Sequence, residues 1–140
     1  MPNLEKVIKA RVKQIIEDNV KQSATLTTDI WSSPSKDPYI SLTLHFLDKE
    51  FRQKMVVLGC FYFPETHEGS HIREKVENIL AEYPGLSSKI VHVVRDNATN
   101  MVAAFDDSPY THSGCFMHIL HLIVTNSVFV YSSIEKIIKK

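Results

Sequence analysis

The sequence contains little of what marks secreted, membrane-spanning or low-complexity proteins. Its 140 residues include two cysteines, Cys60 and Cys115, which are too few for a disulfide framework and fit a reducing compartment in which both stay thiols. No segment reaches the roughly 18 consecutive apolar residues of a membrane span, and residues 1–6 lack the apolar stretch of a secretory signal. We therefore expect an intracellular protein without a membrane partner.

An excess of positive charge is also missing. The chain has 16 basic and 16 acidic residues, so its formal net charge is zero. Domains that bind nucleic acid unaided usually carry a clear basic excess. With 44% hydrophobic residues the chain is long enough to bury a core. We expect a single domain over residues 1–140, and only weak DNA binding by this piece alone.

The first half of the chain combines one helical pattern with three strand patterns. Residues 3–20 space their apolar side chains as an amphipathic helix does. Residues 24–31 are rich in β-forming residues, and residues 39–47 alternate apolar and polar side chains with the period of a half-buried strand. A third strand at residues 52–63 follows so short a turn that it must pair antiparallel with the second.

The second half returns to helical spacing and then alternates again. Residues 71–86 form one apolar helical face, which a Pro-Gly pair ends. Residues 90–94 make an almost continuous apolar strand, as in parallel sheets that are buried on both faces. The rest of the expected core, which spans about residues 24–130, consists of a helix at 97–105, a polar loop at 106–113 and, at 115–130, a brief strand leading into a buried helix.

Two aspartates lie at the ends of expected strands. Asp29 nearly closes the first strand and Asp96 follows the fourth. Three antiparallel strands, a crossover helix and a strand beside the first make the order of a ribonuclease H-like fold, an α/β fold with a mixed sheet and flanking helices. That order brings both carboxylates together, where they suit Mg²⁺ or Mn²⁺. Taken singly, Asp29 has the plainer interpretation of a strand-end polar residue and Asp96 that of a helix N-cap.

Four motifs follow one another along the chain. They are TTDIWSS at residues 27–33, YISLTLHF at 39–46, DNATNM at 96–101 and CFMHILHL at 115–122. In their order and spacing they are similar to signatures of the hAT transposase superfamily, and most of all to those of BED zinc finger domain-containing proteins, many of which are domesticated transposases. The resemblance covers about residues 4–130 and includes His67 and Ile72 near the start of the expected crossover helix.

The resemblance implies the front part of a ribonuclease H-like catalytic core. Asp29 and Asp96 match the first two acids of a three-carboxylate site, which in an active relative would hold two divalent ions. The third acid of the family is a glutamate after a long helical insertion, and Glu135 does not match it. We therefore expect this chain to be truncated before the insertion and the dimerisation region, and it contains no BED-finger pattern of cysteines and histidines.

The Cys115–His118 pair and Trp31 each have two interpretations. On a helix, Cys115 and His118 share a face and, with His112 and His121 nearby, would make half of a zinc site. The favoured interpretation is structural, with the pair packed in the core or hydrogen-bonded beside the acids, because free cysteine is among the most buried residue types. Trp31 is expected to anchor the first strand in the core, and stacking on a DNA base is its alternative.

Two functions follow from these observations. The first is a domesticated, non-catalytic transposase-like core that acts in nuclear DNA-associated or regulatory binding, with protein partners or self-association through regions outside this chain. On this view the chain is not an enzyme as it stands. The alternative is part of an active DNA transposase that uses two-metal phosphodiester chemistry at Asp29 and Asp96 with a third acid from outside the chain. Neutral charge favours the first function and the acid pair favours the second.

Overall fold

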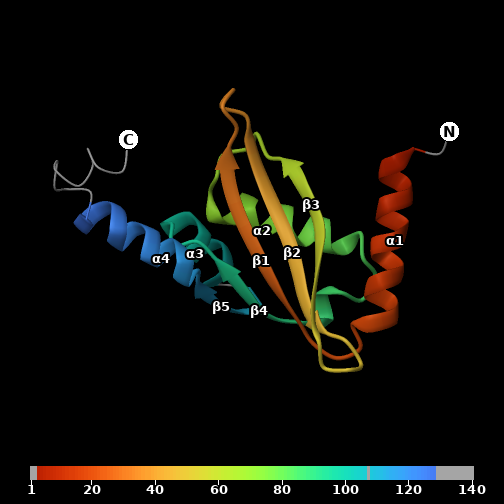
Figure 1. Ribbon diagram of the computed structural model, residues 1–140. Coiled ribbons are helices and arrows are strands. Elements are labelled where there is room, and N and C mark those ends of the chain that lie inside the picture. The colour runs from red at the N-terminus through yellow and green to blue at the C-terminus, as the bar shows by residue number, and fades with distance from the viewer. Residues whose placement is uncertain (1–2, 107, 129–140) are drawn as a thin grey trace, which may run out of the picture.

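In the computed structural model, five strands form one mixed sheet with helices around it (Figure 1). The structure describes residues 3–106 and 108–128. In chain order the elements are α1 (Leu4–Asn19), β1 (Ala24–Ser32), β2 (Pro38–Leu47), β3 (Gln53–Tyr62), α2 (Gly69–Ala81), the 3-10 turn η1 (Ser87–Lys89), β4 (Ile90–Arg95), α3 (Thr99–Asp106), β5 (Thr111–Gly114), α4 (Phe116–Ile123) and the π-helical turn η2 (Val124–Val128).

The strand order across the sheet is β3-β2-β1-β4-β5. β1, β2 and β3 pair antiparallel, whereas β4 runs parallel to β1 and β5 parallel to β4. The expected hairpin of the second and third strands and the place of the fourth strand beside the first are therefore confirmed. The expectation of a loop throughout residues 106–113 was wrong, because β5 begins at Thr111 and pairs with β4.

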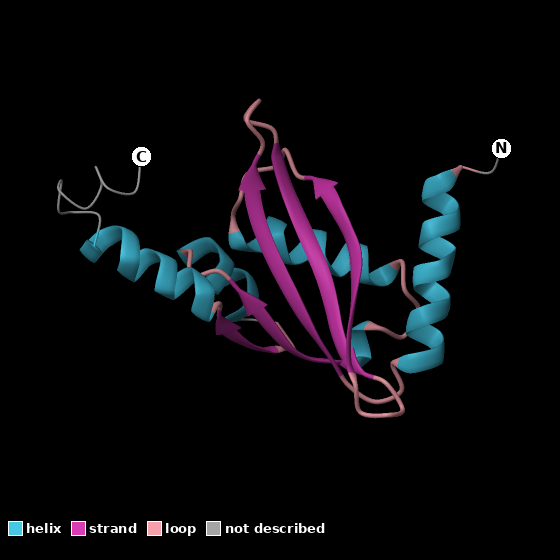
Figure 2. Ribbon diagram, in the orientation of Figure 1, coloured by secondary structure: helices cyan, strands magenta, loops and turns pink. Residues whose placement is uncertain are grey.

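One face of the sheet is covered by α2 and α3, which lie behind the strands in Figure 2. Residues of β2 alternate across the sheet, so that every second side chain points into this layer and is buried. α2 begins at Gly69, where a Cβ would lie 2.9 Å from the backbone nitrogen of Ala104, so a glycine lets α2 approach α3 closely. Fully buried side chains of the core include Leu26, Ile40, Leu42 and Leu44 from the strands, Ile72 and Leu80 from α2, and Met101 and Phe105 from α3.

The opposite face of the sheet, called the open face below, carries polar and aromatic side chains. Thr27, Asp29 and Trp31 of β1 point to this face, since they alternate with the buried Leu26 and Thr28. The open face is turned toward the reader in Figure 2, and no helix within the described residues crosses it. The expected burial of Trp31 was wrong. Its side chain is 40% exposed because its position in β1 directs it away from the helices.

α4 also differs from the sequence expectation. The apolar segment after Cys115 was expected to run through a brief strand into a buried helix, but the helix starts at Phe116 and none of its residues is buried. Phe116, Met117 and Ile123 are each more than half exposed. Residues 129 and 130 of the expected helix lie outside the described part. In the ranges 3–106 and 108–128, no helix has the length and apolarity that crossing a bilayer demands.

The turn between β2 and β3 is organised by Asp48. Its carboxylate Oδ1 accepts hydrogen bonds from the backbone amides of Glu50 at 3.0 Å and Arg52 at 2.9 Å, and its Oδ2 accepts one from Arg52 Nε at 2.9 Å. Desolvation raises the pKa of Asp48, but these donors stabilise the charged carboxylate more strongly, so the pKa lies below its ordinary value. The charged form of Asp48 therefore stabilises the hairpin.

This hairpin gives a pH-dependent prediction. A carboxyl whose pKa is lowered by folding contributes stability above its ordinary pKa of 3.8, and that stability is lost as the pH falls through the lower folded-state value. Asp48→Asn keeps the Oδ1 acceptor and loses the charge. We expect this variant to melt below the wild type at neutral pH and close to it in strong acid, as thermal melts across this range will show. A difference that stays constant at every pH would contradict the prediction. Asp18→Asn, which removes the charge of an exposed carboxylate on α1, is the matched control.

Candidate metal centre

Asp29 and Asp96 lie at the carboxyl ends of two neighbouring strands. The parallel register of β1 and β4 pairs Leu26 with Val93 and Thr27 with Val94. Asp29 and Asp96 each follow two residues after the last of these pairs, so they reach the same edge of the sheet. Both line one cavity of about 210 Å³. The structure therefore brings together the two acids that the sequence singled out.

The same cavity collects residues from all four sequence motifs. Thr27, Thr28 and Asp29 come from β1, Ser41 from β2, Asp96 from the loop after β4, and Cys115 and His118 from the start of α4. Ser41 was not picked out from the sequence. It reaches the site because the antiparallel register of β1 and β2 sets it directly opposite Asp29. Cys115 is half-buried at this cavity rather than packed within the core.

Each aspartate uses one oxygen to accept a hydrogen bond from a nearby backbone amide. Asp29 Oδ1 accepts a hydrogen bond from the Ile30 amide at 3.0 Å, and Asp96 Oδ1 accepts one from the Ala98 amide at 2.8 Å. The interpretation of Asp96 as the N-cap of α3 was wrong, because α3 begins at Thr99 and Ala98 holds the N-cap position, where its carbonyl oxygen accepts from the Val102 amide. Asp96 instead forms an Asx turn before the helix and also lines the cavity. Within residues 3–106 and 108–128, neither carboxylate forms an ion pair with a lysine, arginine or histidine.

The oxygen donors at this cavity suit a hard divalent cation. Two carboxylates and the hydroxyl groups of Thr27 and Ser41 on the open face are the ligand type that Mg²⁺ and Mn²⁺ prefer. Thr28 also borders the cavity, but its side chain alternates with that of Asp29 and points to the helix-covered face, as that of Leu26 does. Its buried Oγ1 therefore does not belong to this donor set. The carboxylates and the two hydroxyl groups on the open face fit the expected cation.

A zinc site around Cys115 does not form in the described residues. His112 lies on β5 and is engaged elsewhere, since its Nδ1 accepts from Arg95 and its Nε2 is 3.2 Å from Asp106 Oδ1. In the ranges 3–106 and 108–128, no three His, Cys, Asp or Glu side chains gather closely enough to hold a metal ion. Cys115 instead anchors the start of α4, where its amide donates to the Arg95 carbonyl oxygen at 2.6 Å.

The side chain of Arg95 fixes the backbone of Asp96 next to the cavity. Its side chain is buried, and its Nη1 donates to the Asp96 carbonyl oxygen at 2.8 Å. Its Nη2 and Nε lie 2.9 Å and 3.2 Å from His112 Nδ1. Because a guanidinium only donates, His112 Nδ1 must accept and the ring proton must sit on Nε2, facing Asp106. Sequence inspection missed Arg95, since a charged residue at a strand end is usually exposed, and it considered His112 only as a zinc ligand.

The strand order and the two strand-end acids together define a ribonuclease H-like domain. A family model described as the ZBED1 RNase-like domain matches residues 27–110, more than half of the chain. The matched range begins inside β1 and extends beyond α3, so it includes both aspartates. This chain belongs to that family, and the fold expected from the sequence is confirmed.

Curated relatives agree with this assignment. The chain is 25% identical to a putative AC transposase of Zea mays over 85% of its length, and 24% identical to the human zinc finger BED domain-containing protein 6 over 99%. It is also 24% identical over 86% of its length to a putative transcriptional regulator, tpeD, of Talaromyces stipitatus. The chain spans only 15–17% of the length of these relatives. The resemblance to transposases and BED zinc finger proteins is thus confirmed.

Proposed function

We propose that this chain is a domesticated, transposase-derived nuclear domain that binds Mg²⁺ or Mn²⁺ between Asp29 and Asp96 and, through the cation, a phosphate group of DNA. The observation that carries the proposal is the shared cavity into which both aspartates project from adjacent strand ends. The family's transposases and the relative described as a transcriptional regulator support a role in DNA-associated regulation. On this proposal the chain binds DNA phosphate and does not cut it unaided.

The chemistry of the site explains why binding and cutting are separable. Two neighbouring carboxylates repel each other, and a divalent cation between them removes that repulsion. When bound, the cation neutralises a phosphate oxygen, which compensates for a chain whose net charge is zero. Strand cleavage through two metal ions needs positions for both the attacking and the leaving oxygen. Asp29 and Asp96 supply the first two acids of such a centre, and we assign the cation-binding step to them.

A second candidate function is phosphodiester cleavage, and it is favoured because the two acids make few interactions within the domain. Asp29 and Asp96 each use one oxygen to accept from a nearby backbone amide, and Asp29 is exposed while Asp96 is half-buried. A third carboxylate from another part of the protein would complete a centre for phosphodiester cleavage. Cutting of supercoiled plasmid that requires Mn²⁺, and is lost in Asp29→Asn, would favour this second function over the first.

Cation-dependent thermal stability tests the first function. A ligand present at 100 times its dissociation constant stabilises the folded state by about 2.7 kcal/mol. We therefore expect Mn²⁺ to raise the melting temperature of the wild type by several degrees, and to leave Asp29→Asn and Asp96→Asn unchanged. Without cation, Asp29→Asn should melt at or above the wild type because a repelling charge has gone.

The control removes an acid elsewhere on the surface. Asp18, near the end of α1, is exposed and accepts a hydrogen bond from Gln14. Asp18→Asn should keep the full Mn²⁺ shift, so loss of the shift in Asp29→Asn would locate the cation at the strand ends. If neither Mg²⁺ nor Mn²⁺ shifts the melting of the wild type, the cation site does not exist and the proposal fails.

A further inference from the structure

Three aromatic rings form a row across the end of the sheet. Trp31 of β1 pairs in register with Tyr39 of β2, which pairs with Tyr62 of β3. The ring centroids of Trp31 and Tyr39 are 6.1 Å apart in a stacked arrangement, and those of Tyr39 and Tyr62 are 5.9 Å apart, edge to face. Trp31 is 40% exposed and Tyr62 is 52% exposed. The row therefore presents ring surface to solvent.

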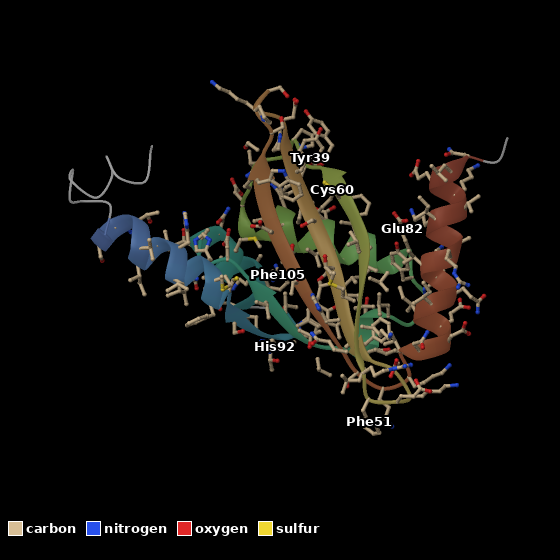
Figure 3. All side chains as sticks on the ribbon, in the orientation of Figure 1. Tyr39, Phe51, Cys60, Glu82, His92 and Phe105 are labelled. Carbon is tan, nitrogen blue, oxygen red and sulfur yellow. The ribbon has the colours of Figure 1, made fainter. Side chains whose placement is uncertain are left out.

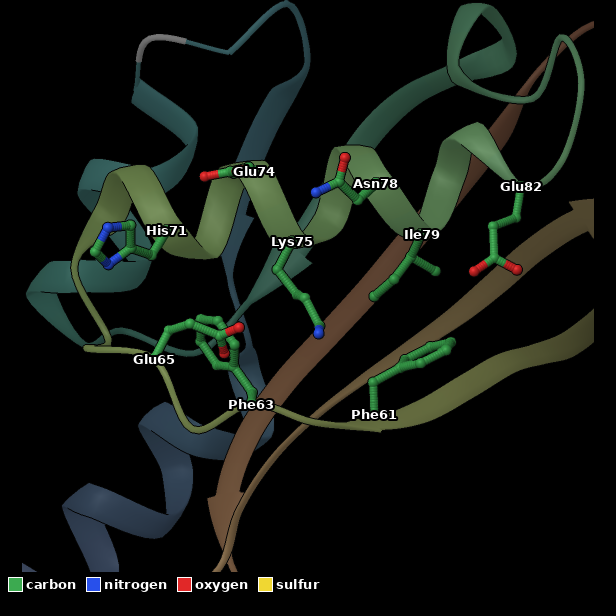
Figure 4. A pocket seen from close by; sticks show the side chains of 9 residues that line it. All are labelled: Phe61, Phe63, Glu65, His71, Glu74, Lys75, Asn78, Ile79 and Glu82. Atoms are coloured by element: carbon green, nitrogen blue, oxygen red, sulfur yellow. The ribbon is translucent and has the colours of Figure 1, made fainter.

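This row lies on the open face, beside the two acids. Phe61 and Phe63 point from the β3 side toward α2, where they line a cavity of about 380 Å³ (Figure 4). Tyr62 lies between them in sequence, so alternation directs it to the opposite face. On β1, Trp31 follows Asp29 by two residues, which places both on one face about 7 Å apart along the strand. Figure 3 labels Tyr39, the central ring, on the strands at this end of the sheet.

Packing alone does not account for this arrangement. Cross-strand aromatic pairs do stabilise a sheet, and the Trp31–Tyr39 pair contributes in this way. The core, however, is on the other face, where Ile40, Leu42 and Leu44 are completely buried. Rings that serve only the core would be covered, whereas two of these three keep about half of their surface in water. Exposed aromatic faces in a row are what unpaired nucleic-acid bases stack on, largely without regard to sequence.

We propose that Trp31, Tyr39 and Tyr62 form a stacking platform for unpaired DNA bases, next to the phosphate that the cation at Asp29 and Asp96 would hold. The inference rests on the proposed function, because that function supplies the phosphate contact, and it adds the form of the substrate, a strand with unpaired bases. The acids repel phosphate when no cation is present, so strand binding depends on the cation. The platform gives affinity through base faces instead of the basic groove that a chain of zero net charge lacks.

The intrinsic fluorescence of Trp31 reports on this contact, since Trp31 is the single tryptophan in the chain. The full chain in Mn²⁺ is titrated with a short single-stranded oligodeoxynucleotide and, separately, with an abasic strand that has the same number of phosphates. We expect the strand with bases to quench Trp31 fluorescence and to bind about 5- to 100-fold more tightly than the abasic strand. Chelation of Mn²⁺ should weaken the binding of both strands.

Substitutions at Tyr62 separate stacking from stability. Tyr62→Ala is expected to reduce affinity for the strand with bases about 5- to 100-fold, to leave abasic binding unchanged, and to stay folded because the residue is half exposed. Tyr62→Phe keeps the ring and should restore the affinity. Phe51→Ala removes an exposed ring from the β2–β3 turn and should have no effect.

Two kinds of result would contradict the stacking platform. One leaves the proposed function in place, and the other contradicts that function as well. Equal affinity for the strand with bases and the abasic strand, or wild-type affinity in Tyr62→Ala, removes the platform and leaves the phosphate contact of the proposed function in place. Failure of both strands to bind in Mn²⁺ removes the proposed function and the platform with it. In that last case, a cation-dependent shift of the melting temperature that is lost in Asp29→Asn would still locate Mn²⁺ at the acids.

Discussion

Replacing Phe63 by alanine is expected to lower the free energy of unfolding by about 3–5 kcal/mol. Phe63 directly follows β3 and is 1% exposed. Its ring stacks on His67 with centroids 5.0 Å apart, and Lys75 Nζ of α2 lies 6.0 Å from its centroid. Its amide donates to the Pro38 carbonyl oxygen at 2.9 Å. The ring thus joins the end of β3 to the segment that leads into α2, and its loss leaves a void that these neighbours fill only in part.

The loss of unfolding free energy in Phe63→Ala depends on the burial of the ring. A second phenylalanine, which is exposed, tests this dependence. Phe51 in the β2–β3 turn is 84% exposed, so Phe51→Ala removes the same atoms from water-exposed surface and should change stability by no more than about 0.5 kcal/mol. Urea unfolding of both variants measures the difference. For a domain whose total stability is about 5–15 kcal/mol, Phe63→Ala removes a large share. Equal unfolding midpoints for the two variants would show that Phe63 is not part of the stabilising core.

The main strands could be predicted because their burial follows their sequence period. Ile40, Leu42 and Leu44 alternate with polar residues, and all three are completely buried on the helix side. β5 could not be predicted in this way, since Thr111–Gly114 has no apolar alternation. Its strand conformation depends on β4, where His92 is 2.8 Å from both the Thr111 and the Ser113 hydroxyl oxygens. Such pairing is a tertiary effect that local sequence does not contain.

The two acids of the site were predicted from the sequence, whereas the residues that surround and position them were not. Asp29 and Asp96 follow apolar strands, so their positions at strand ends could be inferred from the chain alone. Ser41 joins them only through the register of β1 and β2. Alternation from Leu26 already directs Trp31 to the face opposite the core, but which face the helices cover is decided by packing. Arg95 was missed for the same reason, because its burial follows from the partners that β5 and the Asp96 loop provide.

Replacing Arg95 by alanine is expected to destabilise the fold by about 3 kcal/mol and to weaken Mn²⁺ binding about 10- to 100-fold. The substitution removes a buried guanidinium and leaves two acceptors without their donor, the Asp96 carbonyl oxygen and His112 Nδ1. The Asp96 peptide then loses the contact that fixes it, so the two carboxylates no longer hold one geometry. Chemical denaturation measures the first effect, and Mn²⁺ titration of the folded variant measures the second.

Two comparisons separate this positioning role of Arg95 from a general loss of stability. Phe63→Ala should be destabilised at least as much, yet keep wild-type Mn²⁺ affinity below its melting temperature, because Phe63 lies at the β3 edge and Asp96 follows β4. His112→Asn retains an oxygen acceptor for Arg95 and should bind Mn²⁺ more tightly than His112→Ala, which retains none. If Arg95→Ala binds Mn²⁺ as the wild type does, then Asp96 is held by its own Asx turn through Ala98, and Arg95 contributes only to folding.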